Sequence, residues 1–166
     1  MKPSLTASLI AFAVVLASSL AMASESWRSA RDDAFGFRFA YPEALFSSLQ
    51  SDRPSFHYFA SDANDAKFVV GAWVNEQGRT PQQWKDWMLS NGAGYEDVTY
   101  EPRGRNWFVV SGYRGDQIYY EKVMFTCGGG VANVLAIAYP KAKRDLFDAV
   151  VERMEDEFKP GAACGS

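Results

Sequence analysis

Four strand patterns follow one another late in the chain, and this run is the feature that most constrains the fold. The patterns lie near 97–102, 106–113, 117–127 and 131–139. Parallel neighbours would need crossovers of a dozen or more residues, so the short joints favour antiparallel pairing. Gly104-Arg105 and Gly115-Asp116 each place glycine first in a two-residue loop, as a type II′ hairpin requires. We therefore predict an antiparallel meander at the centre of the fold.

The strand pattern at 106–113 is apolar on both of its faces. Bulky residues fill both alternating sets of positions, with Trp107, Val109 and Tyr113 in one set and Phe108 and Val110 in the other. A strand with one face in water would alternate apolar and polar residues instead. Both faces of the sheet must therefore be covered.

The strand pattern at 131–139 has one small face, and the last helix is the natural cover for it. The small residues are Ala132, Val134, Ala136 and Ala138. The helix is indicated by apolar residues at helical spacing, which are Leu146, Phe147, Val150, Val151, Met154 and Phe158. We expect this helix to pack closely on the small face and to stop before Pro160-Gly161.

The first half of the domain supplies further strands and one helix. Phe35, Phe37, Phe39 and Tyr41 alternate with smaller or polar residues, which is typical of a strand. Strands near 55–60 and 67–74 flank a turn-forming joint at 61–65. Thr80, Pro81 and Gln83 predict a helix start with a capping box, and Asn91-Gly92 predicts its end.

These patterns together indicate an α+β fold. We expect an antiparallel sheet of about six to seven strands between helices, an α/β/α sandwich. The single domain spans residues 35–160, residues 24–34 form a polar lead-in outside the core, and 161–166 form a C-terminal tail.

The N-terminus has the layout of a cleavable signal peptide. Lys2 precedes an apolar stretch from Leu9 to Leu16, and Ala21-Met22-Ala23 supplies the small residues of a cleavage site. The stretch is shorter than the roughly 20 residues of a membrane-spanning helix, and no later one is long enough. We expect signal peptide 1–23, cleavage after Ala23, and a soluble periplasmic or secreted product.

Charge argues against nucleic acid as a partner. The chain has 17 basic and 20 acidic side chains, for a net charge of −3. Cleavage would remove only Lys2 among these, which leaves a net charge of −4. Such a mildly acidic chain gives no electrostatic reason to expect nucleic acid or an anionic membrane as a partner.

Cys127 and Cys164 are the two cysteines of the chain, and we expect a disulfide between them. An even pair in an oxidising compartment is more often bridged than free. The bond would tie a strand end to the tail beyond the last helix. The alternative, a catalytic thiol at Cys127, has no histidine nearby in sequence.

Familiar catalytic and cofactor motifs are missing from the sequence. His57 is the single histidine, so zinc sites with two histidines are excluded. No G-x-S-x-G elbow presents a nucleophile, and Gly128-Gly129-Gly130 lacks the Lys-Ser/Thr of a phosphate-binding loop. Asp62, Asn64 and Asp65 lack the rest of a calcium loop. We expect no catalytic residue, metal or cofactor.

Five residues remain as candidate contacts for a ligand or partner. Glu121 and Lys122 interrupt an apolar strand and point to opposite faces, where burial without partners would be costly. They mark either a hydrated part of the sheet or a binding cleft. Trp27, Tyr95 and Tyr113 lie near predicted element ends, where they form either an interaction patch or rim packing.

Three segments carry a family resemblance: Phe35-Gly36-Phe37 with Tyr41-Pro42, WFVVSG at 107–112, and YYEKVMF at 119–125 before Cys127. They resemble a family of exported bacterial proteins, and the element order over roughly 35–160 is similar to the PsbP/Mog-like fold. That fold includes an extrinsic photosystem II subunit and a Ran-binding nuclear import factor. The resemblance implies an accessory or partner-binding role and transfers no catalytic residue.

We therefore expect a non-enzymatic accessory or binding module of the cell envelope, whose partner is a protein or a small ligand. Two alternatives stay open. A periplasmic hydrolase could work through carboxylates, because folding can bring Asp and Glu side chains together into a perturbed pair. A structural envelope component would associate with itself.

Overall fold

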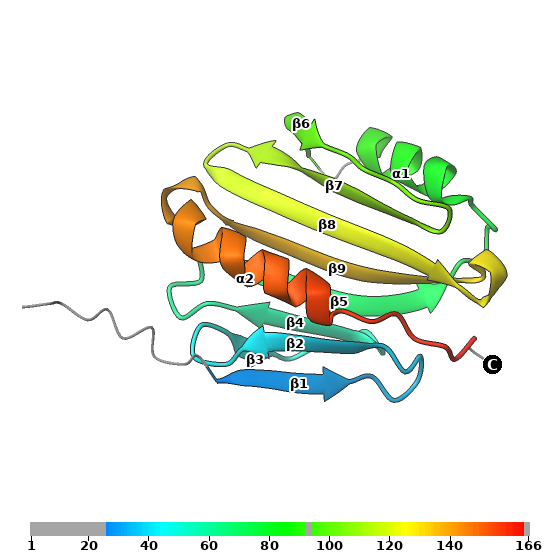
Figure 1. The fold of residues 1–166 in the computed structure, drawn as a ribbon, viewed down its shortest axis with the longest axis horizontal. Helices are drawn as coiled ribbons and strands as arrows, with labels where there is room; N and C mark the ends of the chain where they lie inside the picture. Colours follow the sequence, from blue (N-terminus) through cyan, green and yellow to red (C-terminus); the bar gives the residue numbers. More distant parts are fainter. Residues whose placement is uncertain (1–25, 92–93, 165–166) are drawn as a thin grey trace, which may run out of the picture.

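The computed structural model describes residues 26–91 and 94–164 (Figure 1). The expected signal peptide and its cleavage after Ala23 lie outside the described residues. Within the described ranges, no helix is both long and apolar enough to cross a membrane.

The chain folds into a seven-stranded antiparallel sheet, a separate two-stranded sheet and two α-helices, with strand order β3-β4-β5-β9-β8-β7-β6 in the large sheet (Figure 1). The small sheet pairs β1 (Trp27–Arg31) with β2 (Arg38–Pro42). The other elements are β3 (Ser47–Leu49), β4 (Phe56–Ala60), β5 (Lys67–Val74), α1 (Pro81–Ser90), β6 (Asp97–Tyr100), β7 (Trp107–Arg114), β8 (Gln117–Thr126), β9 (Val131–Pro140) and α2 (Arg144–Glu157). This confirms the predicted α+β class and the antiparallel meander.

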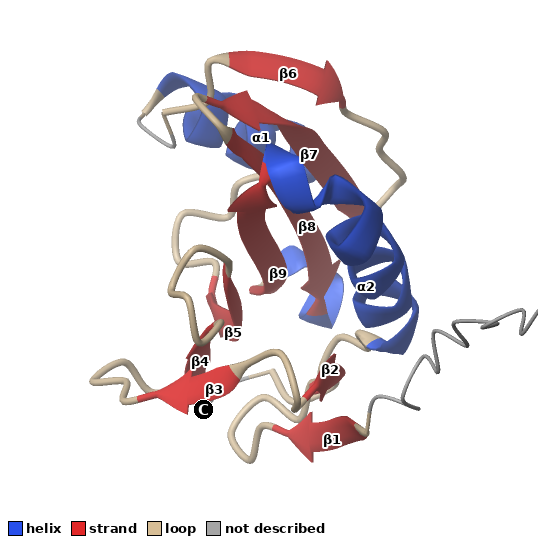
Figure 2. Cartoon of the chain, turned by 90° about the vertical axis from the view of Figure 1, so that its left-hand side faces the viewer, coloured by secondary structure: helices blue, strands red, loops and turns tan. Residues whose placement is uncertain are grey.

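One face of the large sheet is covered by α2 and by the β1–β2 pair (Figure 2). Phe37, Phe39 and Tyr41 of the β2 region pack with the buried side of α2 and with the sheet. This face holds the larger hydrophobic core, which accounts for the alternation of aromatic residues that begins at Phe35.

The opposite face is covered by α1, which packs against the β7 and β8 side of the sheet (Figure 2). Trp84 and Met88 of α1 are buried against Phe108, Val123 and Phe125. Both faces therefore carry a helix, as the two-sided apolar pattern of β7 predicted. The α1 helix is short, however, and does not extend over the whole sheet.

The predicted position of α2 is wrong. Leu135, Ile137 and Tyr139 of β9 pack with α2, whereas Ala136 and Ala138 pack with the α1 side. The larger side chains give α2 more apolar area to bury than the alanines would. The small face of β9 is consequently not covered by a closely packed helix.

The lead-in expected at 24–34 is also incorrect in part, because residues 27–31 form β1. Trp27 and Ala30 are half-buried and pack on the main core, so the segment contributes to the fold. Its two half-buried residues are three positions apart with the exposed Arg28 and Ser29 between them, so the segment shows no period-2 alternation that would predict a strand.

The predicted turns have mixed outcomes. Thr80 forms the expected capping box with Gln83, and Gly115 has a φ of 53° in a two-residue loop between the paired Arg114 and Gln117. Gly104 lies instead in a longer connection and does not have a positive φ. A Cβ there would lie 2.2 Å from the Trp107 indole nitrogen, so close packing explains this glycine.

The C-terminal tail continues from the end of α2 to the turn between β8 and β9 (Figure 1). A disulfide joins Cys127 to Cys164, with 5.5 Å between the Cα atoms. The Gly161 amide donates to the Asn133 side-chain oxygen at 3.0 Å, and the Ala163 amide donates to the Phe35 carbonyl at 3.2 Å. The tail thus ties the β8–β9 turn to the β1–β2 turn.

Candidate functional site

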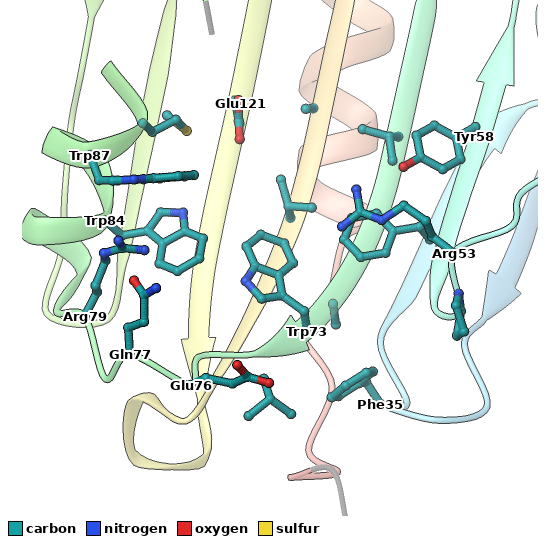
Figure 3. Close-up of a pocket in the computed structure, with 18 of the residues that line it drawn as sticks. Phe35, Arg53, Tyr58, Trp73, Glu76, Gln77, Arg79, Trp84, Trp87 and Glu121 are labelled. Atoms are coloured by element: carbon teal, nitrogen blue, oxygen red, sulfur yellow. The ribbon is translucent and has the colours of Figure 1, made fainter. Parts of the chain in front are cut away.

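A groove of about 920 Å³ lies on the α1 side of the sheet, where the small face of β9 is left open (Figure 3). Trp84, Trp87 and Arg79 lie on one side of it, Tyr58 and Arg53 lie on the other, and Trp73 lies between them. The groove exists because α1 covers this face of the sheet only as far as β8. The sheet extends beyond the helix to β5 and β4, and that part of the face is left open.

The floor of the groove is made by small residues in register on neighbouring strands. Tyr58 of β4 pairs with Val69 of β5, Val69 with Ala136 of β9, and Ala136 with Glu121 of β8. Two small side chains therefore separate Tyr58 from Glu121 along one row. Side chains of this size leave the space above β5 and β9 empty.

Gly71 sets the position of Phe56, which lines the β4 side of the groove. The two residues are cross-strand partners, and a Cβ on Gly71 would lie 2.6 Å from the Phe56 ring. The missing side chain leaves the space over β5 that this ring occupies. Phe56 then stacks on Trp73 with 5.7 Å between ring centroids.

A continuous series of aromatic rings crosses the groove. Phe56 lies next to Tyr58 and Trp73, Trp73 lies 5.2 Å from Trp84, and Trp84 lies 5.6 Å from Trp87. Trp84 is buried beneath α1, whereas 42% of Trp87 is exposed at the rim. Aromatic side chains of this kind offer large contact areas at a low cost in conformational entropy.

The loop between β5 and α1 is fixed by Asn75, which is 6% exposed. Its side-chain amide donates to the carbonyls of Arg79 and Gly129, at 2.9 and 2.8 Å, and its oxygen accepts from the Arg79 amide at 3.2 Å. This network fixes the backbone that carries Glu76, Gln77 and Arg79 along the groove.

Each side of the groove carries an arginine that lies over aromatic rings. The Arg79 guanidinium is 4.8 Å from the Trp87 ring and 5.5 Å from the Trp84 ring, and that of Arg53 is 4.3 Å from the Phe56 ring. Such contacts contribute about 0.5–1 kcal/mol each at exposed sites. Among the described residues, neither arginine forms a salt bridge.

Glu121 lies where the groove meets a smaller cavity of about 230 Å³ over Ala136 and Ala138. Its carboxylate accepts a hydrogen bond of 2.5 Å from the Tyr95 hydroxyl, and Tyr95 stacks on Tyr119 at 4.0 Å. Burial raises the pKa of Glu121, and the Tyr95 hydrogen bond and the Arg114 charge partly oppose that rise. Burial also raises the pKa of Tyr95.

The structure brings together two of the five predicted contact residues, Glu121 and Tyr95. Lys122 points to the other face, where its ammonium lies 2.8 Å from the Glu155 carboxylate of α2. Tyr113 and Trp27 also belong to the α2 side of the molecule. The aromatic residues singled out from sequence therefore do not form one patch.

Tyr113 and Trp27 each lie under a cation. Lys141 is 4.4 Å from the Tyr113 ring, and the Arg153 guanidinium is 4.1 Å from the Trp27 ring. Both aromatic side chains are half-buried and pack on the main core. Packing at the rim of the core therefore accounts for the positions of Tyr113 and Trp27.

His57 also lies on the α2 side and is occupied by structural contacts. Its Nε2 lies 3.3 Å from a carboxylate oxygen of Asp32, and its ring packs against Phe37 and Phe39. Asp32 in turn accepts a hydrogen bond from the Phe35 amide. No nucleophile takes part in these contacts among the described residues.

The groove is better equipped for binding than for acid–base chemistry. Among the described residues that line it, Glu121 is a carboxylate whose pKa is raised by burial, while Asp52 and Glu76 lie exposed at the edge. A carboxylate-dependent hydrolase needs two carboxyl groups in one site, held at different pKa values. The residues that line the groove offer apolar surface, two guanidinium groups and a few polar groups at its edge.

Sequence reasoning did not identify Arg53, Arg79 and Trp73 as site residues. Arg53 and Arg79 occur in loops, where an arginine is most often solvated. Trp73 follows Val69 and Gly71 at alternate positions of one strand. The interruption of this apolar face by glycine was the available signal, because a glycine inside a strand often marks a close approach of another group.

No protein-family model and no curated protein matches the chain. Solved structures do match. Cyanobacterial PsbP (CyanoP) from Synechocystis has a TM-score of 0.57 at 12% identity, over 82% of this chain and 93% of that one. The Saccharomyces cerevisiae Ran-binding protein Mog1p has a TM-score of 0.58 at 8% identity, over 86% and 100%. A point mutant of the protein Mog1 has a TM-score of 0.53 at 11% identity, over 82% and 97%.

These similarities confirm the PsbP/Mog-like fold that the sequence pattern indicated. They cover most of this chain and nearly all of each matched chain, so the shared part is the whole α+β unit. The identities are low, and the match therefore concerns the arrangement of elements. No residue of the groove acquires a role from it.

Proposed function

We propose that the chain is an exported, non-enzymatic binding module of the cell envelope, and that the groove over β5 and β9 is its binding site. The groove carries the proposal: it is a large concave surface that the fold leaves open and lines with aromatic rings and arginines. Tryptophan, tyrosine and arginine are the residues most enriched where binding energy concentrates.

The shape of the groove favours a macromolecular partner. Its volume of about 920 Å³ is near the upper end for small-molecule sites, which usually enclose most of the ligand surface. Here the edges are accessible, with 42% of Trp87 and 47% of Val74 exposed. A surface of this kind suits a segment of another protein better than an enclosed small molecule.

Export is supported by the layout of residues 1–23 and by the disulfide between Cys127 and Cys164. Disulfides persist in oxidising compartments such as the bacterial periplasm. A binding role also agrees with the name of one structural neighbour, a Ran-binding protein. That agreement is an analogy at the level of the fold.

Filling the groove tests the proposal. Ala136→Trp places an indole on the floor, and Ala149→Trp places the same side chain on the exposed side of α2 as a matched control. Affinity capture of the tagged proteins from cells after crosslinking should recover a partner with the wild type and with Ala149→Trp, but not with Ala136→Trp. Equal recovery by both variants, with both folded, would refute a role for the groove.

A further inference from the structure

We infer that the groove binds an acidic segment of a partner protein, in which carboxylates flank bulky apolar side chains. This inference rests on the proposed function and specifies the chemistry of the partner. The feature that carries it is the juxtaposition of Arg53 and Arg79 on opposite sides of the groove, with the Trp73 ring between them (Figure 3).

Both arginines are held in place before any ligand arrives. The Arg79 backbone is fixed by two hydrogen bonds with the Asn75 side chain, and its guanidinium lies over Trp84 and Trp87. The Arg53 amide and carbonyl both bond to the Ser51 hydroxyl, and its guanidinium lies over Phe56. Less ordering is left to occur on binding, which favours affinity.

The donors of these two arginines are open to a ligand. Contact with a ring face takes up no hydrogen-bond acceptor and therefore leaves the N–H donors of a guanidinium unused. Within the described residues, the Arg53 and Arg79 side chains donate no hydrogen bond to a carboxylate. A planar fork of N–H donors matches a carboxylate in two-point geometry.

The same arrangement disfavours a cationic ligand. Aromatic rings grouped as they are here can bind lysine or quaternary ammonium groups through their faces. In this groove Arg79 and Arg53 already lie over Trp87 and Phe56. A second cation would meet both an occupied ring face and a like charge.

Three carboxylates also line the groove, and their positions limit their effect. Glu121 accepts the Tyr95 hydrogen bond at one end. Asp52 and Glu76 are exposed at the edge, as Arg53 is, and within the described ranges neither carboxylate forms a salt bridge with either arginine. They weaken acidic binding without competing for the ordered guanidinium groups. Removing the charge of Glu76 should therefore strengthen binding, opposite in sign to the loss of either arginine.

Selection from a random peptide library displayed on phage tests the inference, with the purified, oxidised protein as target. The selected peptides should be enriched in Asp and Glu beside Leu, Ile or Phe. Their affinities can be followed through the fluorescence of Trp73, Trp84 and Trp87 with tryptophan-free peptides. The double variant Arg53→Gln/Arg79→Gln should bind them about tenfold more weakly or worse, and Glu76→Gln should bind them more tightly.

Arg153→Gln is the matched control, because Arg153 lies over Trp27 in the same way on the other face. It should leave peptide affinity unchanged. Selection of neutral or basic peptides, selection of none, or equal binding by the Arg53→Gln/Arg79→Gln and Arg153→Gln variants would each overturn the inference. The proposed function has its own test, and it would be refuted if Ala136→Trp still captured the cellular partner.

Discussion

Gly71 and Phe56 show how one missing side chain shapes the groove. The ring of Phe56 occupies the space that a Cβ on Gly71 would need, 2.6 Å from the nearest ring atom. Gly71→Ala must push the ring away from the sheet and from Trp73. Overpacking of this kind costs about 1–3 kcal/mol. We expect a lower free energy of unfolding in urea and a change in tryptophan fluorescence.

The control for this prediction is a double-mutant cycle. Phe56→Ala removes the ring that the new methyl group strikes, so the added cost of Gly71→Ala should largely disappear in that background. If Gly71→Ala costs the same with and without the Phe56 ring, the clash is not the source of the effect.

Glu121 gives a pH-dependent prediction. Burial holds its pKa above the ordinary Glu value in the folded protein, so the folded state binds the proton more tightly than the unfolded chain does. Its contribution to stability is therefore fully present below the ordinary Glu pKa, is lost as the pH rises from there through the raised pKa of the folded state, and stays reduced above it. Glu121→Gln should raise the free energy of unfolding at neutral pH, and the gain should vanish below about pH 4.

Urea unfolding across this pH range measures the effect. The amide of Gln can still accept from the Tyr95 hydroxyl, so the substitution removes charge more than contacts. Glu76→Gln serves as the control, because Glu76 is exposed and should give little change at any pH. A stability gain for Glu121→Gln that did not vary with pH would contradict the assignment.

At the scale of elements, the β5–α1 loop joins the sheet to the helix that bounds the groove. Asn75 is buried and makes three side-chain hydrogen bonds there, whereas Thr80 makes a single exposed capping bond. Asn75→Ala leaves buried partners unsatisfied and should cost about 2–4 kcal/mol. Thr80→Ala should cost about 1 kcal/mol. Chemical denaturation of both variants checks the order, and a larger loss for Thr80→Ala would contradict it.

Elements with strong local signals were predictable from the sequence, and others were not. Thr80, Pro81 and Gln83 located the start of α1 because capping chemistry is local. The three-residue strand β3 was missed, since all of its residues are exposed and it gives no alternation. The face that α2 covers was mispredicted because alanines on β9 permit a close helix but do not require one.

The groove itself could not be read from the sequence. It depends on the register that aligns Val69, Ala136 and Glu121 across strands distant in the chain. Glu121 and Tyr95 were identified because a charge inside an apolar strand and a ring near a predicted loop are visible locally. Arg53 and Arg79 become notable only when the rings beneath them are placed.

For the whole molecule, the disulfide is the main long-range constraint. It joins residues separated by 37 positions and holds the tail against the β1–β2 turn. In the loop-entropy account, closing a loop of this size contributes about 4 kcal/mol. Cys127→Ser/Cys164→Ser, or reduction of the wild type, should lower the free energy of unfolding by roughly that amount. Reductant should not affect the double variant, and an unfolding midpoint unchanged by reduction would contradict a structural role.

The most direct test of the binding groove is site-specific photocrosslinking in cells, with a photoreactive residue at Trp87 or at Leu146. The two positions are similarly exposed, 42% and 45%, but Trp87 borders the groove while Leu146 lies on α2 at the other face. The proposed site predicts a discrete protein adduct from position 87 and none from position 146. An adduct from position 146 alone, or none from position 87, would contradict it.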